Sequence, residues 1–153
     1  MKLNYIIIPL IVFLTALAGS LLTSSAMGWY KTINKPSWTP AGSLIGAVWT
    51  ALFILAAIST LIAWNRLPHD SRFKWIIAVF IINALLNVLW SWLFFNQHML
   101  GAAIFEANLL AASVVALVIL IWPGSALAAS LLIPYAAWVL FATFLTYQVW
   151  SLN

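Results

Sequence analysis

Glu106 is the only acidic side chain within the long apolar stretches of this 153-residue sequence. A carboxylate placed in hydrocarbon costs roughly 2.5 kcal/mol or more, so it normally faces a protein interior, a partner or a cavity. Glu106 is therefore our first candidate for a group that binds a ligand. The alternative interpretation is a protonated carboxyl group that hydrogen-bonds between helices and serves only the fold.

The ten tryptophans of the sequence fall into two main groups by their depth in the apolar stretches. Five stand where an aromatic belt at the membrane interface requires them: Trp29, Trp64, Trp75, Trp122 and Trp150. Trp49, Trp90 and Trp138 lie about 9 to 18 Å inside the membrane, in the same half as Glu106, when helical residues are counted at about 1.5 Å each. Helices in lipid pack through small residues, so these deep indoles predict a cavity wall, with core filling as the alternative.

A polar and aromatic face is predicted on the third apolar stretch, where Asn83, Asn87, Trp90, Ser91 and Phe94 recur at helical spacing. Lipid would reject two exposed carboxamides, so this face must point into the protein. The two asparagines then either bond neighbouring helices or contact a ligand.

Other kinds of active site find little support in the sequence. It contains no cysteine, which excludes disulfides, thiolate catalysis and cysteine-bound metals. His69 and His98 both fall between apolar stretches, so no imidazole lies deep in a helix as an axial haem ligand. We predict no metal site and no obligatory cofactor, and any chemistry would have to come from a bound ligand.

The composition predicts an integral membrane protein, because 66% apolar and 5% charged residues leave too little polar surface for a water-soluble globule. A stretch of about 20 apolar residues is long enough to cross a bilayer as a helix. The sequence contains five such stretches, at residues 4 to 26, 43 to 64, 74 to 96, 100 to 122 and 126 to 150. We therefore expect an all-α, five-helix transmembrane bundle that forms one domain over residues 1 to 153.

The formal charge of +4 predicts an orientation in the membrane rather than nucleic-acid binding. The cations of one side are Lys2, Arg66, Arg72 and Lys74, and those of the other side are Lys31 and Lys35. This bias favours a multi-pass protein with a cytoplasmic N-terminus. Residues 2 to 19 also resemble a signal peptide with a cleavage site at Ala16-Leu17-Ala18, but the apolar run continues to Leu22 and only further membrane helices follow.

The one long connection, residues 27 to 42, is named the lid loop here. Gly28, Pro36, Pro40 and Gly42 predict that it is ordered but not helical, with Trp38 held between the two prolines. Such a loop can cover a site inside the bundle.

Two further features concern helix packing. Pro134 removes a backbone hydrogen bond and predicts a kink that widens the bundle interior beside Tyr135 and Trp138. Small residues at four-residue spacing permit close helix contact, within one copy of the chain or between copies. They are Gly42 with Gly46, and Ala103 with Ala107 and Ala111.

These motifs together resemble the TspO/MBR family of tryptophan-rich sensory proteins, which includes the mitochondrial translocator proteins once called peripheral benzodiazepine receptors. The resemblance rests on Trp29-Tyr30 and Lys35-Pro36-Ser37-Trp38-Thr39-Pro40, Gly46-x-x-Trp49, Asn83-x-x-x-Asn87-x-x-Trp90-Ser91 with Phe94-Phe95, and Pro134-Tyr135-x-x-Trp138-x-x-Phe141-Ala142-Thr143. The motifs cover nearly the whole chain and are specific in combination. One departure is Ala41, where the family commonly has a second proline.

The resemblance implies a five-helix bundle, usually a homodimer in the lipid bilayer, with a pocket under the lid loop. Family members bind porphyrins such as protoporphyrin IX and benzodiazepine- or isoquinoline-type ligands there. Carried over by position, the pocket residues are Tyr30, Trp38, Pro40, Trp49, Phe53, Asn87, Trp90, Ser91, Phe94, Glu106, Trp138 and Ala142. The family also suggests light-dependent breakdown of bound protoporphyrin, with Trp49 and Trp138 as electron or radical partners. Sterol recognition is unsupported, because no basic residue follows Tyr147.

Three functions therefore stay open. The first is a membrane receptor or sensor that binds a tetrapyrrole against indole walls. The second is a transporter of porphyrins or other small amphiphiles, although five helices without an inverted repeat offer little machinery for alternating access. The third is a structural membrane protein in which Glu106 and the asparagines only hold helices together.

Overall fold

The computed structural model describes residues 2–153, and this part of the chain contains helices and no strands. Five helical spans are long and apolar enough to cross a membrane, which confirms the predicted all-α transmembrane bundle. The span ends lie close to the predicted ones. The largest difference is the start of the third span, at residue 71 instead of 74.

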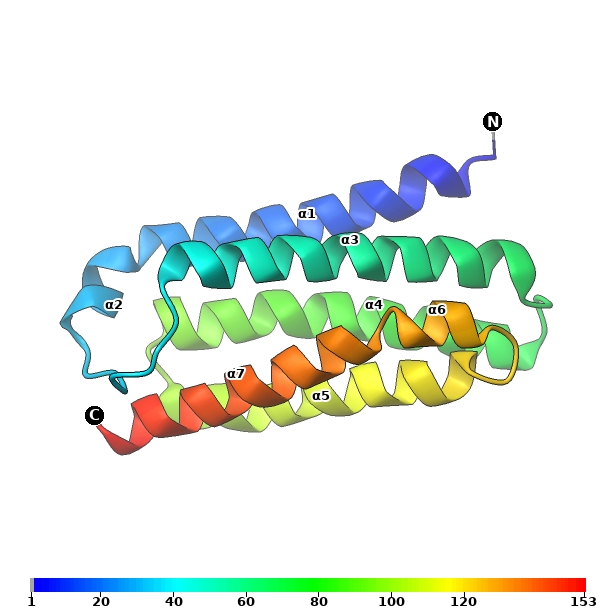
Figure 1. Ribbon diagram of the computed structural model, residues 1–153. Coiled ribbons are helices and arrows are strands. Elements are labelled where there is room, and N and C mark those ends of the chain that lie inside the picture. Colours follow the sequence, from blue (N-terminus) through cyan, green and yellow to red (C-terminus); the bar gives the residue numbers. More distant parts are fainter. Residues whose placement is uncertain (1) are drawn as a thin grey trace.

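The spans lie side by side and alternate in direction (Figure 1). In chain order the elements are α1 (Asn4–Ser25), α2 (Met27–Thr32), α3 (Gly42–Arg66), α4 (Ser71–Ser91), the π-helical η1 (Trp92–Asn96), α5 (Leu100–Ile121), α6 (Ala126–Ser130) and α7 (Ile133–Ser151). The third span consists of α4 with η1, and the fifth consists of α6 with α7. The lid loop lies at the same end of the bundle as the C-terminus (Figure 1).

Helix α5 is the most buried of the spans, because both α4 and α7 pack along it. Its small residues Ala103, Ala107 and Ala111 are 0, 3 and 5% exposed, so they serve contact within one copy of the chain. Gly42 and Gly46 differ, since a Cβ added at either would meet no atom of residues 2–153 within 4 Å apart from chain neighbours and the nearby backbone of its own helix. The two sets of small residues therefore have different surroundings, which their spacing did not reveal.

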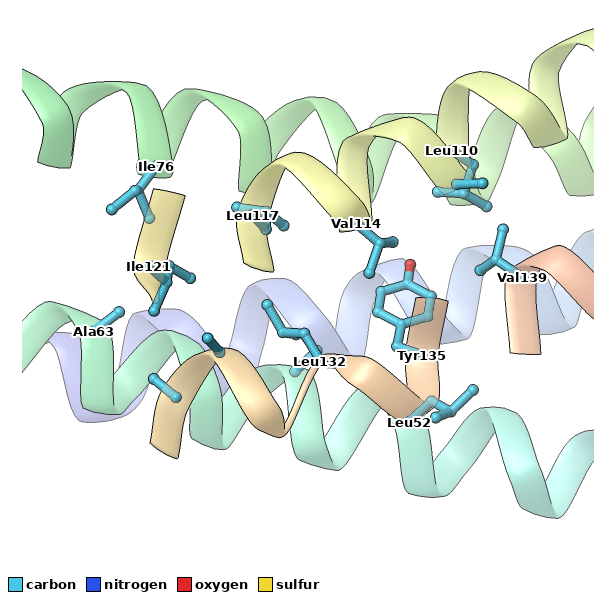
Figure 2. Packing of buried hydrophobic residues seen from close by; sticks show 14 of the residues in the cluster. Leu52, Ala63, Ile76, Leu110, Val114, Leu117, Ile121, Leu132, Tyr135 and Val139 are labelled. Atoms are coloured by element: carbon cyan, nitrogen blue, oxygen red, sulfur yellow. The ribbon is translucent and has the colours of Figure 1, made fainter. Parts of the chain in front are cut away.

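The largest cluster of buried side chains joins α5 to α3, α4, α6 and α7. Figure 2 shows Val114, Leu117 and Ile121 of α5 beside Leu132 and Tyr135 of the fifth span. None of these five is more than 2% exposed. In lipid such contacts stabilise mainly through van der Waals packing, because hydrocarbon outside the bundle is as apolar as its core.

The prediction that the whole lid loop is non-helical is wrong for its first part, which forms α2. Both prolines of the loop come after the end of α2, so neither interrupts it. Trp29 and Tyr30 of α2 pack against Phe94 of η1, with ring centroids 5.8 and 6.2 Å apart. This tertiary contact outweighs the low helix propensity of Gly28. Residues 33–41 are non-helical, as predicted.

The predicted kink at Pro134 takes the form of a break in the fifth span. Residues 131 and 132 make a turn between α6 and α7, and Pro134 lies in the first turn of α7. There the missing N–H removes no helical hydrogen bond. Ser59 of α3 holds the broken end, because its Oγ donates to the carbonyl oxygen of Ala128 at 2.7 Å.

Polar side chains near the middle of the bundle bond α4 to α5 and α7. Asn83 donates through Nδ2 to Oγ of Ser113 at 2.8 Å, and its Oδ1 accepts from the Tyr135 hydroxyl at 2.9 Å. Asn87 donates through Nδ2 to the same hydroxyl group. All four side chains are buried. The asparagine face thus bonds neighbouring helices, the first of the two roles expected for it.

A pair of asparagines ties the lid loop to the C-terminal end of α7. The backbone N–H of Asn34 donates to Oδ1 of Asn153 at 3.0 Å, and Nδ2 of Asn153 donates to the carbonyl oxygen of Asn34 at 2.9 Å. Nδ2 of Asn34 also donates to the carbonyl oxygen of Leu152 at 3.2 Å. These bonds hold residues 33–41 across the end of the bundle.

We predict that Tyr135→Phe destabilises the bundle by about 1 to 2 kcal/mol, because it leaves Oδ1 of Asn83 and Nδ2 of Asn87 without their shared partner. Tyr147→Phe is the matched control, since Tyr147 lies on the same helix but is 47% exposed. The measurement is reversible unfolding in mixed detergent micelles. Equal stability of the two variants would show that the network does not hold the helices together.

We predict that Asn153→Ala frees the lid loop, because it removes the side chain that bonds the backbone of Asn34 in both directions. Amide hydrogen exchange in residues 33–41 should become about threefold to tenfold faster, as expected for the loss of about 1 kcal/mol. Asn108→Ala is the control, because among residues 2–153 Nδ2 of Asn108 bonds only the carbonyl oxygen of Ile104 in its own helix. Unchanged exchange in Asn153→Ala would contradict the proposed tie.

Candidate functional site

A series of aromatic rings leads from the lid loop to the middle of α7. Trp38 stacks on Phe144, with centroids 5.7 Å apart and ring planes at 11°, and it also contacts Phe141 at 6.1 Å. Phe141 in turn contacts Trp138 at 5.2 Å. We call these four residues the lid series. Their contacts hold Trp38 of the loop against α7.

Trp49 approaches the same region from α3. Its ring lies 6.1 Å from that of Tyr135 and 5.7 Å from that of Phe53. Trp49 and Trp138 are both partly buried and pack against the same core cluster. The two tryptophans expected to take part in photochemistry thus pack against the same buried cluster, Trp49 from α3 and Trp138 from α7.

Two buried polar groups in this half of the bundle lack a partner. Glu106 is 3% exposed, and neither of its carboxyl oxygens forms a hydrogen bond with residues 2–153. The indole Nε1 of Trp138 is also buried and unbonded within this part of the chain. Buried polar atoms in proteins are almost always paired, so each exception requires an explanation. The alternative interpretation of Glu106, a carboxyl group that only joins helices, would need an interhelical hydrogen bond, and residues 2–153 provide none.

A second aromatic group lies between α2 and the end of the third span. Trp90 stacks on Phe94 with centroids 5.0 Å apart, and Tyr30 contacts Phe94 and Phe95. Burial raises the pKa of Tyr30, so its phenol stays neutral at physiological pH. Trp29 stacks on His98 at 3.9 Å and closes the group at the membrane edge. These contacts dock α2 onto η1.

The two lysines of the lid loop differ in their surroundings. Nζ of Lys35 donates to the carbonyl oxygens of Tyr30 and Ile33, at 2.6 and 2.9 Å, and lies 4.6 Å from the centre of the Tyr30 ring. It thereby satisfies carbonyl groups at the end of α2, where a cation is favourable. Lys31 is exposed. Of the two cations, Lys31 is therefore the freer one to meet an anionic ligand.

The other predicted pocket residues are spread over the bundle. Ser91 is buried and donates to the carbonyl oxygen of Asn87 at 3.2 Å. Asn87 and Phe53 line an apolar groove between α1, α3 and α4, away from the lid series. Pro40 and Ala142 are partly buried. The structure thus brings Trp38 and Trp138 together through Phe141, groups Tyr30, Trp90 and Phe94 elsewhere, and separates both sets from the groove.

Several residues of the site were missing from the sequence-based set. Phe141 and Phe144 complete the lid series, and Tyr135 joins Trp49 to the polar network. The spacing of Tyr135, Trp138 and Phe141 along one helix face was a signal that could have found two of these. The bonds between Asn34 and Asn153 join residues 119 positions apart, and no local pattern announces them.

Comparison with known proteins agrees with the fold and with the motifs. The sequence profile of the TspO/MBR family matches residues 6–151. The "Tryptophan-rich protein TspO" of Bacillus cereus is 33% identical over 153 residues, which cover 100% of this chain and 99% of the relative. The protein of the same name from Archaeoglobus fulgidus is 38% identical over 89% of this chain and 88% of the relative. The human "Translocator protein" is 32% identical over 82% of this chain and 75% of the relative. This chain therefore belongs to the TspO/MBR family of integral membrane proteins.

Proposed function

We propose that this membrane protein is a receptor or sensor that binds a tetrapyrrole, with protoporphyrin IX as the representative ligand, beneath the lid loop. The family supports a sensor or transporter role in the membrane. The observation that supports a tetrapyrrole as the ligand is that two buried groups, Glu106 and Nε1 of Trp138, lack a partner within residues 2–153. Both lie in the half of the bundle at the lid-loop end, which also contains the lid series.

The chemistry of a free-base porphyrin matches these groups. Its face is large, flat and apolar, which suits the aromatic rings of Trp38 and Phe141. Its central ring offers both N–H donors and nitrogen acceptors, which complement the carboxyl group of Glu106 and the indole N–H of Trp138. Its propionates carry negative charge, and the exposed Lys31 in the lid loop supplies a cation for them.

A light-dependent reaction is the finer form of the proposal. Bound protoporphyrin absorbs light, and in this proposal Trp49 and Trp138 are the indoles that exchange electrons with it. The protein would hold the ligand and exclude water, while the photochemistry would be supplied by the porphyrin. Benzodiazepine- and isoquinoline-type compounds fit the same aromatic surroundings as synthetic ligands. The homodimer expected from the family stays a prediction.

Transport of porphyrins is the second candidate, favoured by the name "Translocator protein" of the human relative. Flux of protoporphyrin across liposomes that contain the purified protein separates transport from binding. A purely structural role would leave both binding and flux absent.

We predict that protoporphyrin binds stoichiometrically to the purified protein in detergent and quenches its tryptophan fluorescence. Trp138→Phe and Trp49→Phe should change quenching and photoproduct yield strongly, because these indoles adjoin the proposed site. Trp64→Phe and Trp150→Phe are controls at the ends of the bundle. Equal effects of all four substitutions would mean that the indoles report only on the membrane belt.

We predict that Glu106→Gln weakens porphyrin binding while the melting temperature stays near that of the parent protein. Glutamine keeps the shape and part of the hydrogen-bonding capacity of the carboxyl group but cannot ionise. Glu106→Leu should weaken binding further, by about 1 to 3 kcal/mol, since it leaves the polar group of the ligand unpaired. Unchanged binding in both variants, together with a large melting loss in Glu106→Leu, would assign Glu106 to the fold instead.

We predict that Ala41→Pro tightens porphyrin binding about twofold to fivefold by stiffening the lid loop. The φ angle of Ala41 is −57°, close to that of proline, and its N–H donates no hydrogen bond within residues 2–153. Pro40→Gly should instead weaken porphyrin binding, because it makes the lid loop more flexible. Bound porphyrin should also protect the loop from protease. Proteolysis at the same rate with and without saturating porphyrin would rule out the lid.

A further inference from the structure

An apolar groove of about 270 Å³ lies between α1, α3 and α4, in the half of the bundle opposite the lid loop. Its walls are Ile7, Ile8, Ile11, Val12 and Thr15 of α1, Phe53, Ala56, Thr60 and Trp64 of α3, and residues of α4 from Ile77 to Asn87. In Figure 1 the N-terminal half of α1 diverges from α3. Ile7, Ile11 and Ile81 at its rim are 42, 48 and 53% exposed. The groove therefore opens toward the bilayer rather than toward water.

The groove continues toward the membrane surface at the N-terminal end of α1. A second hollow, of about 290 Å³, adjoins it there and shares Ile7, Ile8 and Trp64 with it. Leu3 and Asn4 complete this outer hollow. At its inner end the groove reaches Tyr135, Asn83 and Asn87, whose polar atoms bond one another and leave an apolar wall. The two hollows together run from the interface toward the middle of the membrane.

A polar group in the outer hollow, where the groove meets the membrane surface, has no partner within residues 2–153. Asn4 is 9% exposed and lines the outer hollow, and its Nδ2 is buried without a hydrogen bond to any residue of 2–153. A carboxamide donor in this position fits an ester or phosphate oxygen at the level of the lipid headgroups. Lys74 is exposed and stands three residues before Ile77 and seven before Ile81, so it extends the α4 stripe that lines the groove. The mouth is therefore suited to an anion.

We propose that this groove is a binding site for one phospholipid of the leaflet at the N-terminal end of α1. One acyl chain occupies the groove, its ester or phosphate oxygens accept from Nδ2 of Asn4, and Lys74 selects an anionic headgroup. The lining supports this occupant, because the groove is almost entirely apolar, has exposed isoleucines beside it, and carries its one buried unpartnered donor, Nδ2 of Asn4, at the headgroup end. The site is separate from the one proposed under the lid loop and does not depend on it.

The test uses the full chain, delipidated in detergent and then given dioleoyl phosphatidylglycerol or dioleoyl phosphatidylcholine. Native mass spectrometry counts the lipids that each protein retains. The parent protein should retain one phosphatidylglycerol in preference to phosphatidylcholine. Ala84→Phe should weaken retention on the order of tenfold, because it fills the groove and displaces roughly two methylene groups of the acyl chain.

Ala112→Phe is the matched control, because Ala112 is exposed on α5, away from the groove, and its substitution should leave retention unchanged. Asn4→Leu and Lys74→Gln should reduce the preference for phosphatidylglycerol while leaving the melting temperature near that of the parent. These two variants keep the proposal testable even when Ala84→Phe fails to fold.

Three results would overturn the proposal. The first is equal retention by the parent, Ala84→Phe and both mouth variants. The second is retention of many lipids without preference, which describes an ordinary lipid annulus. The third is a change from dimer to monomer in Ala84→Phe within the same spectra, which would assign the groove to a second copy of the chain.

Discussion

The absence of water in a bilayer is the constraint on which this structure depends. Within hydrocarbon, each polar group must find a partner in the protein or in a bound molecule. Asn83, Asn87, Ser113 and Tyr135 satisfy this rule among themselves and in doing so join α4 to α5 and α7. Ser59 does the same for the broken fifth span by bonding the Ala128 carbonyl group. The bundle is thus held by a few interhelical bonds and by close packing along α5.

The same constraint gives meaning to the polar atoms that stay unpaired. The buried unbonded side-chain atoms among residues 2–153 belong to Asn4, Asn96, Glu106 and Trp138. Asn96 stands near a membrane edge, and its Nδ2 bonds Oγ of Ser25. Glu106 and Trp138 lie in the half under the lid loop, whereas Asn4 lies at the mouth of the groove. At both places an unpaired buried group is costly unless a bound molecule pairs it.

The two halves of the bundle are built for different neighbours. At one end, α2 docks on η1, and Trp38 of residues 33–41 packs on α7. Aromatic contacts and the hydrogen bonds of Asn34 with Asn153 hold these segments across that end of the bundle. At the other end, an apolar groove lies between α1, α3 and α4, and Ile7, Ile11 and Ile81 beside it are exposed. The first arrangement is the basis of the proposed porphyrin site, and the second is the basis of the proposed lipid site.

The sequence by itself determined the class of protein, the number and bounds of the spans, the family and the inward face of Asn83 and Asn87. These features follow from apolar length, helical spacing and the cost of polar groups in lipid, all of which are local. Tertiary structure decided the rest. Helix α2 forms because Trp29 and Tyr30 meet η1, and the lid loop is tied to the end of α7 because Asn34 meets Asn153. The grouping of predicted pocket residues also depended on which helices adjoin. Such contacts join residues far apart in the chain, and no local pattern encodes the distance between them.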